Sequence, residues 1–467
     1  MSRSTDRQIY VVLGLARSGQ AAAQVLLGEG HIVRVTDIRP ATDFDAVLAA
    51  LLRTAGNAGG SLETVFGRHP VSLLDGAAAV ILSPGVPERI PFVQAARRRA
   101  IPVWSEVELA ARHLHGTMIG ITGSNGKSTT TALLAHILQQ AGRPAHAAGN
   151  IGRALCEFIP GDTPTTTYVT ELSSFQLETI DTFRPHIGLI LNITPDHLDR
   201  YHSVDEYARA KWALFKNCSA SDFAVLNARD PWLVSQAPIL TCRVLWFDST
   251  RRPSPADIPG AGLVDDRLWL RLDDESLSLM ARAELPLPGR HNLENCLAAA
   301  LAARLCGLNT VEIRQGIVSF RGLAHRLETV AEIDGRLFVN DSKATNIDST
   351  RLALESYGQP VVLILGGKDK GSDFSSLRET IQAHVRHMLL VGEAAPLIER
   401  ALAGTAPLTH CRDFDEVVRR GLELSAAGDV VLLSPACASF DMFDDFEHRG
   451  EVFRQAVLAL QKEKHRC

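Results

Sequence analysis

The sequence lacks paired cysteines of the metal-binding kind and lacks any long apolar run. Its eight cysteines, at positions 156, 218, 242, 296, 306, 411, 437 and 467, show no CxxC spacing. We therefore expect a reduced, cytoplasmic protein with unpaired thiols, in which Cys437 is structural. The apolar run near the start, YVVLGLA, is too short for a signal peptide, and no window approaches the length of a membrane span.

The sequence also has no excess of basic residues, no internal repeats and no low-complexity tracts. The formal net charge is −5 and no basic tail is present, which argues against nucleic acid as the main partner. Hydrophobic residues make up 46% and charged residues 22%, as in ordinary globular proteins. A chain of 467 residues is too long for one core, so we expect two to four domains.

Short apolar runs alternate with helical patterns along the chain, which predicts an α/β fold with mostly parallel sheets. We predict three domains, with boundaries at 1–105, 106–322 and 323–467 and a hinge near 322. The first and third are Rossmann-like. The central one carries a parallel sheet and a small antiparallel addition at about 250–285. In the third, four predicted strands each end in Gly, Ser, Asp or Asn (RLFVNDS, PVVLILGG, HMLLVGE, VVLLSPA), which predicts a site at the carboxyl edge of its sheet.

The segment MIGITGSNGKSTT, residues 118–130, predicts a phosphate-binding loop. An apolar strand leads into a glycine-rich turn, and Gly126-Lys127-Ser128 opens a helix. Backbone N–H groups of such a turn point at an anion, the lysine adds a positive charge, and the hydroxyl can hold Mg²⁺. Ile121 stands where the general motif has its first glycine. We predict that this loop binds a nucleoside triphosphate.

Three further residues of the central domain are candidate metal ligands. Glu171 ends a predicted strand and is either a metal ligand or a capping residue. His197, between Asp196 and Asp199, is either a ligand or a loop histidine. Lys211 would by default be a solvent-exposed helix lysine, because an ammonium 4 Å from Mg²⁺ is repelled by roughly 8 kcal/mol. Carbamylation by CO₂ would turn it into an oxygen ligand, but the residues alone do not single it out.

The first predicted strand leads into the turn GLARSG, and Asp37 follows about 20 residues later. This is also the pattern of a dinucleotide site, which would make the chain an NAD-linked oxidoreductase. The turn lacks the middle glycine that lets backbone approach a pyrophosphate, which disfavours that alternative.

The motifs TGSNGKST, GNIG, ELSSFQLE, NITPDHLDRY, ARAK, LPGRHNLEN, GLAHRLE, NDSKATN, LILGGKDKGSDF and SPACASFDMF…FEHRG run in this order from about residue 14 to 450. The series resembles the Mur ligases of peptidoglycan synthesis over nearly the whole chain. The resemblance implies an N-terminal UDP-binding domain, a central ATPase domain and a C-terminal amino-acid-binding domain. It also implies ATP-dependent joining of D-glutamate to UDP-N-acetylmuramoyl-L-alanine through an acyl phosphate, in the cytoplasm. NDSKATN and SPACASFD distinguish this substrate pair within the family.

The resemblance implies a role for each matching residue. Lys127, His197, Lys211 and Lys343 would be catalytic. Two Mg²⁺ ions would be held by Ser128 and Glu171, and by His197 and a carbamylated Lys211. ATP would contact Gly123, Ser124, Asn125, Gly126, Lys127, Ser128, Thr129, Asn295, Arg326 and Asp341. The UDP substrate would contact Leu15, Ala16, Arg17, Ser18, Asp37, Arg39 and Asn150. D-Glutamate would contact Thr345, Lys370, Ser439, Phe440 and Phe446.

Some alternatives stay open. Either His197 or a metal-bound oxygen would deprotonate the attacking amine. A P-loop ATPase or switch with a partner-binding third domain would show nucleotide hydrolysis that needs no amino acid. A related ligase would take a different amino acid. Arg17 is larger than the residue expected in its turn, which leaves its contact with the UDP-sugar open. We expect a monomer.

Overall fold

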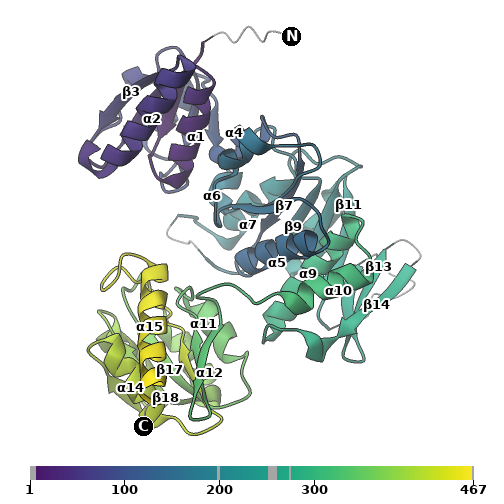
Figure 1. The fold of residues 1–467 in the computed structure, drawn as a ribbon, viewed down its shortest axis with the longest axis vertical. Helices are drawn as coiled ribbons and strands as arrows, with labels where there is room; N and C mark the ends of the chain where they lie inside the picture. The colour runs from purple at the N-terminus through teal and green to yellow at the C-terminus, as the bar shows by residue number, and fades with distance from the viewer. Residues whose placement is uncertain (1–6, 197–199, 251–259, 273–274, 465–467) are drawn as a thin grey trace. The chain divides into compact units, whose positions relative to one another are not determined.

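The computed structural model describes residues 7–196, 200–250, 260–272 and 275–464. The described residues form three sheets, each with helices packed against it (Figure 1). The chain divides into two compact units, Met1–Met280 with Asn295–Gly316, and Ala281–Glu294 with Ile317–Cys467. The first unit contains two of the sheets and the second unit contains the third.

The N-terminal sheet is wholly parallel, in the order β3-β2-β1-β4-β5. Its strands are β1 (Ile9–Leu13), β2 (Ile32–Asp37), β3 (Ser61–Phe66), β4 (Ala77–Leu82) and β5 (Val103–Ser105). Its helices are α1 (Arg17–Gly28), α2 (Asp45–Ala58), α3 (Pro91–Arg98) and the connecting α4 (Glu106–Ala111), with short 3₁₀ turns η1 (Ala41–Phe44) and η2 (Val71–Leu74). Alanines and leucines on one face of α1 are buried, so that helix packs closely on its neighbours.

The central sheet has the order β14-β13-β12-β11-β10-β9-β6-β8-β7. Strands β6 to β12 run parallel, and β13 turns back antiparallel to β12, as the sequence predicts for this segment. Its strands are β6 (Thr117–Thr122), β7 (Ala145–Gly149), β8 (Thr167–Glu171), β9 (Ile187–Ile190), β10 (Phe223–Asn227), β11 (Arg243–Asp248), β12 (Gly260–Val264), β13 (Arg267–Leu272) and β14 (Glu275–Ala281).

Helices cover the central sheet. They are α5 (Lys127–Gln140), α6 (Ser174–Leu177), α7 (Val204–Trp212), α8 (Pro231–Gln236), α9 (Arg290–Leu305) and α10 (Thr310–Ser319), with 3₁₀ turns η3 (Leu155–Gly161), η4 (Ala213–Phe215) and η5 (Ala237–Ile239). The 3₁₀ turn η6 (Arg282–Glu284) belongs to the second unit. Helix α10 packs closely on α5 at Gly316. A Cβ added at this glycine would lie only 2.7 Å from the Cα of Ile137 on α5. Alanines dominate the buried part of α9, as its uniformly apolar sequence predicts.

The C-terminal sheet has the order β15-β16-β20-β17-β18-β19, with only β15 antiparallel. Its strands are β15 (Glu328–Ile333), β16 (Arg336–Asn340), β17 (Val361–Gly366), β18 (Val385–Val391), β19 (Leu408–His410) and β20 (Val430–Leu433). Its helices are α11 (Ile347–Leu354), α12 (Arg378–His384), α13 (Ala395–Leu402), α14 (Phe414–Leu424) and α15 (Phe446–Lys464), with the 3₁₀ turn η7 (Phe374–Leu377).

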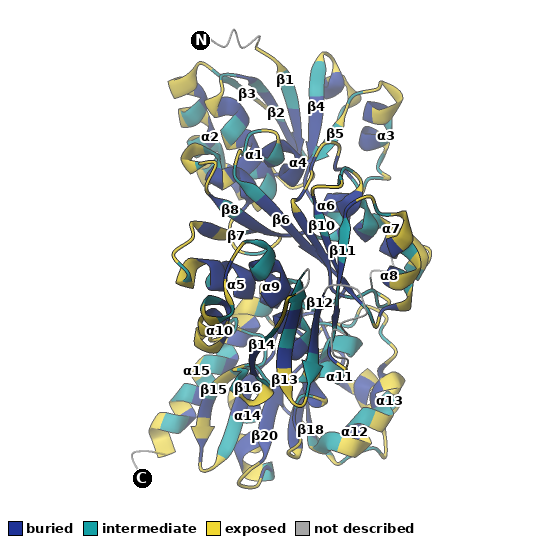
Figure 2. Cartoon of the chain, turned by 90° about the vertical axis from the view of Figure 1, so that its right-hand side faces the viewer, coloured by how far each residue is buried: buried dark blue, intermediate teal, exposed yellow. Residues whose placement is uncertain are grey.

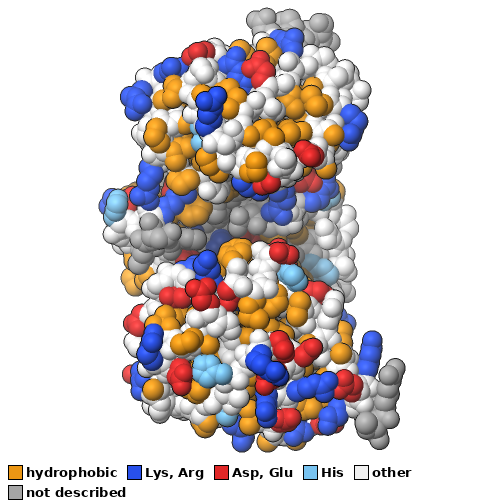
Figure 3. Space-filling model, turned by 90° about the vertical axis from the view of Figure 1, so that its left-hand side faces the viewer, with side chains coloured by type: hydrophobic (Ala, Val, Ile, Leu, Met, Phe, Trp, Pro, Cys, Tyr) orange, Lys and Arg blue, Asp and Glu red, His pale blue; other side chains and the backbone are white. Residues whose placement is uncertain are grey.

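The parallel strands form the cores of the sheets and are buried along most of their length (Figure 2). Every residue of β17 and of β20 is buried, because helices cover both faces of the sheet. On the face drawn in Figure 3, acidic and basic side chains are interspersed, in keeping with the small net charge. Among the described residues, no helix is long and apolar enough to cross a membrane. The three-domain α/β fold predicted from the sequence is confirmed.

Candidate active site

The predicted phosphate loop connects β6 to the N-terminus of α5, as the strand–turn–helix pattern requires. Gly126 caps the helix in the left-handed region, at φ +85°. A Cβ there would lie 2.3 Å from Oδ1 of Asn295, on α9. Only glycine therefore fits at this position, both for its backbone conformation and for the space that Asn295 leaves. The structure thus brings Asn295 to the loop, although 169 residues of sequence separate it from Gly126.

The segment after β9 holds the loop in place. The backbone N–H of Asn125 donates to Oδ1 of Asn192 (2.8 Å), and the hydroxyl of Ser124 donates to the carbonyl of Thr194 (2.9 Å). The lysine of the loop, Lys127, donates to the carbonyls of Gly123 and Ser124, both at 2.9 Å. Ser128 and Thr129 are buried in the first turn of α5. The loop is therefore a preformed anion cradle whose ammonium lies against its own backbone.

Glu171 ends β8 beside the loop and is buried. Its Oε1 accepts a hydrogen bond from the side-chain amide of Asn150 (2.9 Å), and its Oε2 has no hydrogen-bond partner. A buried carboxylate oxygen without a partner costs free energy unless a cation or a donor satisfies it. The pair Asn150–Glu171 was not foreseen, although each residue was a candidate on its own.

Lys211 on α7 is 1% exposed, so the default interpretation of a solvent-exposed helix lysine is wrong. Its ammonium nitrogen lies 4.5 Å from the centre of the Tyr207 ring and 3.5 Å from the hydroxyl of Thr122, the last residue of β6. Burial, and then the charge of Lys127, hold the pKa of Lys211 well below its ordinary value, against the opposing effects of Asp196 and Glu171. A buried lysine in this setting favours the neutral amine, which is the nucleophilic form.

His197 and Asp199 lie outside the described residues. Within the described ranges, no three His, Cys, Asp or Glu side chains gather as a metal-binding group.

In the C-terminal unit, the loops after β16, β17 and β20 leave the same edge of the sheet, as the sequence predicts. These loops carry Lys343 and Thr345, Lys370, and Ser439 and Phe440 respectively. The ammonium of Lys343 lies 3.6 Å from the centre of the Phe446 ring, a cation–π contact with the first residue of α15. Lys370 and Phe440 are exposed, and Ser439 is buried.

Arg449, a residue that sequence reasoning missed, joins two of these loops. Its guanidinium is 2% exposed and donates to Oγ (2.9 Å) and the carbonyl (2.7 Å) of Ser342, and to the carbonyls of Cys437 (3.1 Å) and Ala438 (3.3 Å). Arg449 lies among the polar residues Glu447, His448 and Glu451, so its sequence surroundings give no signal that it is buried. Arg449 therefore fixes the loop of NDSKATN against the loop of SPACASF.

Asp341 lies at the base of the same edge, buried, and accepts hydrogen bonds from the hydroxyl of Ser434 (3.0 Å) and the N–H of Leu327 (3.2 Å). Burial raises its pKa to about 7, against these hydrogen bonds and the charges of Arg326 and Arg449. Asp341 and Arg326 are therefore close enough for their charges to interact.

At the N-terminal sheet, Asp37 holds the turn after β1. Its carboxylate accepts from the N–H of Leu15 (2.8 Å) and the N–H of Arg39 (3.0 Å). These bonds, which outweigh the opposing effect of burial, hold the pKa of Asp37 below its usual range. The guanidinium of Arg39 lies 4.4 Å from the centre of the Phe44 ring. Asp37 thus shapes the turn that contains Leu15, Ala16, Arg17 and Ser18.

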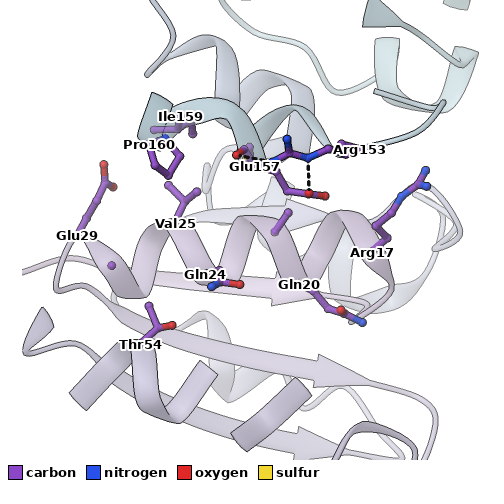
Figure 4. Close-up of a pocket in the computed structure, with 13 residues that line it drawn as sticks. Arg17, Gln20, Gln24, Val25, Glu29, Thr54, Arg153, Glu157, Ile159 and Pro160 are labelled. Atoms are coloured by element: carbon purple, nitrogen blue, oxygen red, sulfur yellow. Dashed lines mark hydrogen bonds and ion pairs between the residues drawn. The ribbon is translucent and has the colours of Figure 1, made fainter. Parts of the chain in front are cut away.

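Arg17 begins α1, is exposed, and lines a cavity of about 650 Å³ between α1 and η3 (Figure 4). Gln20 and Gln24 line the cavity from α1, and Arg153 and Glu157 line it from the other side, paired to each other at 3.0 Å. Arg17, which is part of the predicted UDP-binding turn, therefore also lines this cavity.

Comparison with known proteins identifies relatives over the whole chain. Family models match at residues 8–105 (Mur ligase MurD-like, N-terminal domain), 121–303 (Mur ligase middle domain) and 325–437 (Mur ligase, glutamate ligase domain). The UDP-N-acetylmuramoylalanine–D-glutamate ligase of Solibacter usitatus is 43% identical over 97% of this chain and 98% of its own. The ligase of the same name from Anaeromyxobacter dehalogenans is 45% identical over 95% of this chain and 96% of its own.

Solved structures share the fold. The MurF ligase of Thermotoga maritima in complex with ADP aligns with a TM-score of 0.61 at 16% identity, over 100% of both chains. The UDP-N-acetylmuramate–alanine ligase MurC of the same organism aligns with a TM-score of 0.58 at 17% identity, over 97% of this chain and 99% of its own.

Proposed function

Because the chain belongs to the Mur ligase family, we propose that it joins D-glutamate to UDP-N-acetylmuramoyl-L-alanine and converts ATP to ADP and phosphate. The full-length likeness to D-glutamate ligases carries this proposal. The reaction belongs to cytoplasmic peptidoglycan synthesis, and we expect the enzyme to act as a monomer.

In the first step, the carboxylate of the alanyl group attacks the γ-phosphorus of ATP, and ADP leaves from an acyl phosphate. The N–H groups of the phosphate loop and Lys127 bind and orient the phosphates, which is the main task of an enzyme in phosphoryl transfer. Lys127 exchanges its bonds to the carbonyls of Gly123 and Ser124 for phosphate oxygens. Arg326 and Asn295 are proposed to contact the nucleotide.

The unpartnered Oε2 of Glu171 and the buried hydroxyl of Ser128 fit a divalent cation, because both are hard oxygen donors beside the phosphate loop. Glu171 and Ser128 would hold one Mg²⁺, and His197 with Lys211 would hold the second. Bound Mg²⁺ supplies neutralisation of charge on the transferring phosphoryl group.

Lys211 fits the second group of ligands only after reaction with CO₂. Its burial and its lowered pKa favour the neutral amine that such a reaction requires. The carbamate is an anion with oxygen donors, so the charge that would repel a metal becomes one that attracts it. Lys211→Ala is expected to lose activity and to recover part of it with short carboxylates. A Lys211→Ala protein that folds normally but is not rescued would count against the carbamate.

In the second step, the deprotonated amine of D-glutamate attacks the acyl carbon, and phosphate leaves from a tetrahedral intermediate. The carboxylates of glutamate are proposed to bind Lys343, Lys370, Thr345 and Ser439, which lie on loops at one sheet edge. Phe446 is held in this loop cluster by its contact with Lys343 and by the bond from Ser342 Oγ to its carbonyl (2.8 Å). The amine must lose a proton before it attacks, and His197 would be the base that this chain offers for it.

The test is ADP release measured with each substrate omitted in turn. We expect release to require both UDP-N-acetylmuramoyl-L-alanine and D-glutamate, and Lys343→Ala to abolish it. Equal support by L-glutamate or a diamino acid would show that the amino-acid assignment is wrong. Release without any amino acid, unchanged in Lys343→Ala, would instead identify an ATPase with another role.

A further inference from the structure

Glu178, the residue that follows α6, binds two neighbouring residues of the segment that leads into α7. Its Oε2 accepts a hydrogen bond from the guanidinium of Arg200 (2.5 Å), and its Oε1 accepts one from the hydroxyl of Tyr201. The side chains of Glu178 and Arg200 are only 19% and 16% exposed, so water screens this ion pair little. None of these three residues has a role in the reaction steps described above.

Arg200 and Tyr201 are held by further contacts. The guanidinium carbon of Arg200 lies 3.9 Å from the centre of the Phe175 ring on α6, and that ring stacks on the ring of Tyr201 at 6.2 Å between centres. Arg89, in the loop after β4, donates to the backbone carbonyl of Arg200 (3.0 Å). Side-chain and main-chain contacts therefore fix this segment together.

The contacts continue from Tyr201 to Lys211. The ring of Tyr201 lies 5.3 Å from the ring of Tyr207 on α7, and both tyrosines are buried. Lys211 is one helical turn further along α7, and its ammonium nitrogen lies 4.5 Å from the centre of the Tyr207 ring. Helices α6 and α7 pack against each other, so these residues form one continuous cluster (Figure 1).

We propose that Glu178 is a positioning residue for the ligation, which acts on Lys211 through the two tyrosines between them. This inference rests on the proposed function, in which Lys211 holds a metal ion after its reaction with CO₂. A lysine side chain has many rotamers, whereas a metal ligand must be held to within about 0.5 Å of its place. The Tyr207 ring restricts those rotamers, so the place of that ring decides where the end of the lysine lies.

The test is a double-mutant cycle on the kcat of ADP release, with Glu178→Gln and Lys211→Ala as the two single variants. Acetate is present throughout, so that the lysine variant retains measurable activity. We expect Glu178→Gln to lower kcat about 10–100-fold in the unaltered chain but less than about twofold in Lys211→Ala. The reason is that an acetate ion in place of the carbamate does not depend on the side chain that Tyr207 holds.

Two further variants keep the test independent of folding. Tyr201→Phe keeps the ring and removes only the hydroxyl that Glu178 binds, and we expect a smaller loss of kcat with the same dependence on Lys211. Arg209→Gln is the matched control on α7, because Arg209 is 75% exposed and pairs with Asp205 on the surface. Its kcat is expected to equal that of the unaltered chain, and thermal unfolding midpoints report the stability of every variant.

The possible failures are distinguishable. Losses from Glu178→Gln and Lys211→Ala that multiply would overturn the proposal, because Glu178 would then act independently of the lysine or through general stability. An unchanged kcat in Glu178→Gln, or an equal loss in Arg209→Gln, would overturn it as well. A Lys211→Ala enzyme that is fully active, or that acetate does not rescue, would remove the carbamate and this inference with it. Absence of ADP release by the unaltered chain would instead reject the proposed function itself.

Discussion

Glu171 has one carboxylate oxygen bound by Asn150 and one without a hydrogen-bond partner, in a buried position beside the phosphate loop. We predict that Glu171→Gln, which keeps the shape and removes the charge, raises the Mg²⁺ concentration for half-maximal ADP release by about 10–100-fold. Titration of Mg²⁺ in the ADP-release assay measures this. Glu157→Gln, at an exposed ion pair with Arg153, is the control and should leave the Mg²⁺ curve unchanged. Equal Mg²⁺ curves for both variants would show that Glu171 does not bind Mg²⁺.

At the residue scale, the single side chain of Arg449 holds two loops together by hydrogen bonds. Arg449→Lys keeps the positive charge but cannot reach Ser342 and the carbonyls of Cys437 and Ala438 together, because an ammonium lacks the planar fork. We predict that the KM for D-glutamate rises about tenfold or more while the KM for ATP changes little. A parallel rise in both constants would instead indicate general loss of structure.

At the scale of one element, two glycines flanking α5 separate the effect of backbone conformation from the effect of the space available to a side chain. Gly126 and Gly142 lie at opposite ends of α5, and both have positive φ, +85° and +72°. An added Cβ meets Asn295 at 2.3 Å in the first case and nothing within 4 Å in the second. Both alanine variants therefore carry backbone strain of about 1–2 kcal/mol.

We predict that only Gly126→Ala loses ATP binding, by about tenfold or more, since it also displaces Asn295 and the turn that presents the N–H groups. Isothermal titration with ATP compares the two variants, and their unfolding midpoints report the shared strain. Equal ATP affinity in Gly126→Ala and Gly142→Ala would show that the contact with Asn295 has no part in nucleotide binding.

At the scale of the whole molecule, each compact unit contains a buried carboxyl group whose pKa burial raises to about 7, Glu106 in the first and Asp341 in the second. Glu106 is 1% exposed and accepts from the N–H of Cys156 (2.5 Å), and its Oε2 has no partner. In the unfolded chain these groups ionise near pH 4, so between pH 4 and 7 the folded state holds protons that the unfolded state has lost.

The stabilisation from these protonated groups is complete below the unfolded pKa and is lost as pH rises through 7. We predict that Glu106→Gln, which stays neutral, removes part of this decline, up to about 1.4 kcal/mol per pH unit. Urea unfolding at pH 4.5, 6 and 8 measures the free energy of unfolding of both proteins. Parallel curves for Glu106→Gln and the unaltered chain would show that Glu106 ionises normally in the folded state.

The sequence predicted the central strands well, because strands covered on both faces are continuously apolar, as in VVLIL and VVLL. It missed four strands at sheet edges, β3, β7, β15 and β19, where SLETVF, AHAAG, ETVAEI and LTH carry polar or small residues. It also missed β11, which lies inside the central sheet. It identified the phosphate loop because the residues of that loop are contiguous in the sequence. The role of Arg449 depends on contacts between distant segments, and a single sequence holds no record of such contacts.

The hydrogen bonds of Arg449 have a consequence for how the chain folds during its own translation. Arg449 is separated by 107 positions from Ser342, the residue whose loop it fixes. During translation the strand and loop containing Lys343 leave the ribosome well before the guanidinium that holds them exists. A nascent chain interrupted between these points would contain the complete phosphate loop but not the side chain that fixes the loop of Lys343.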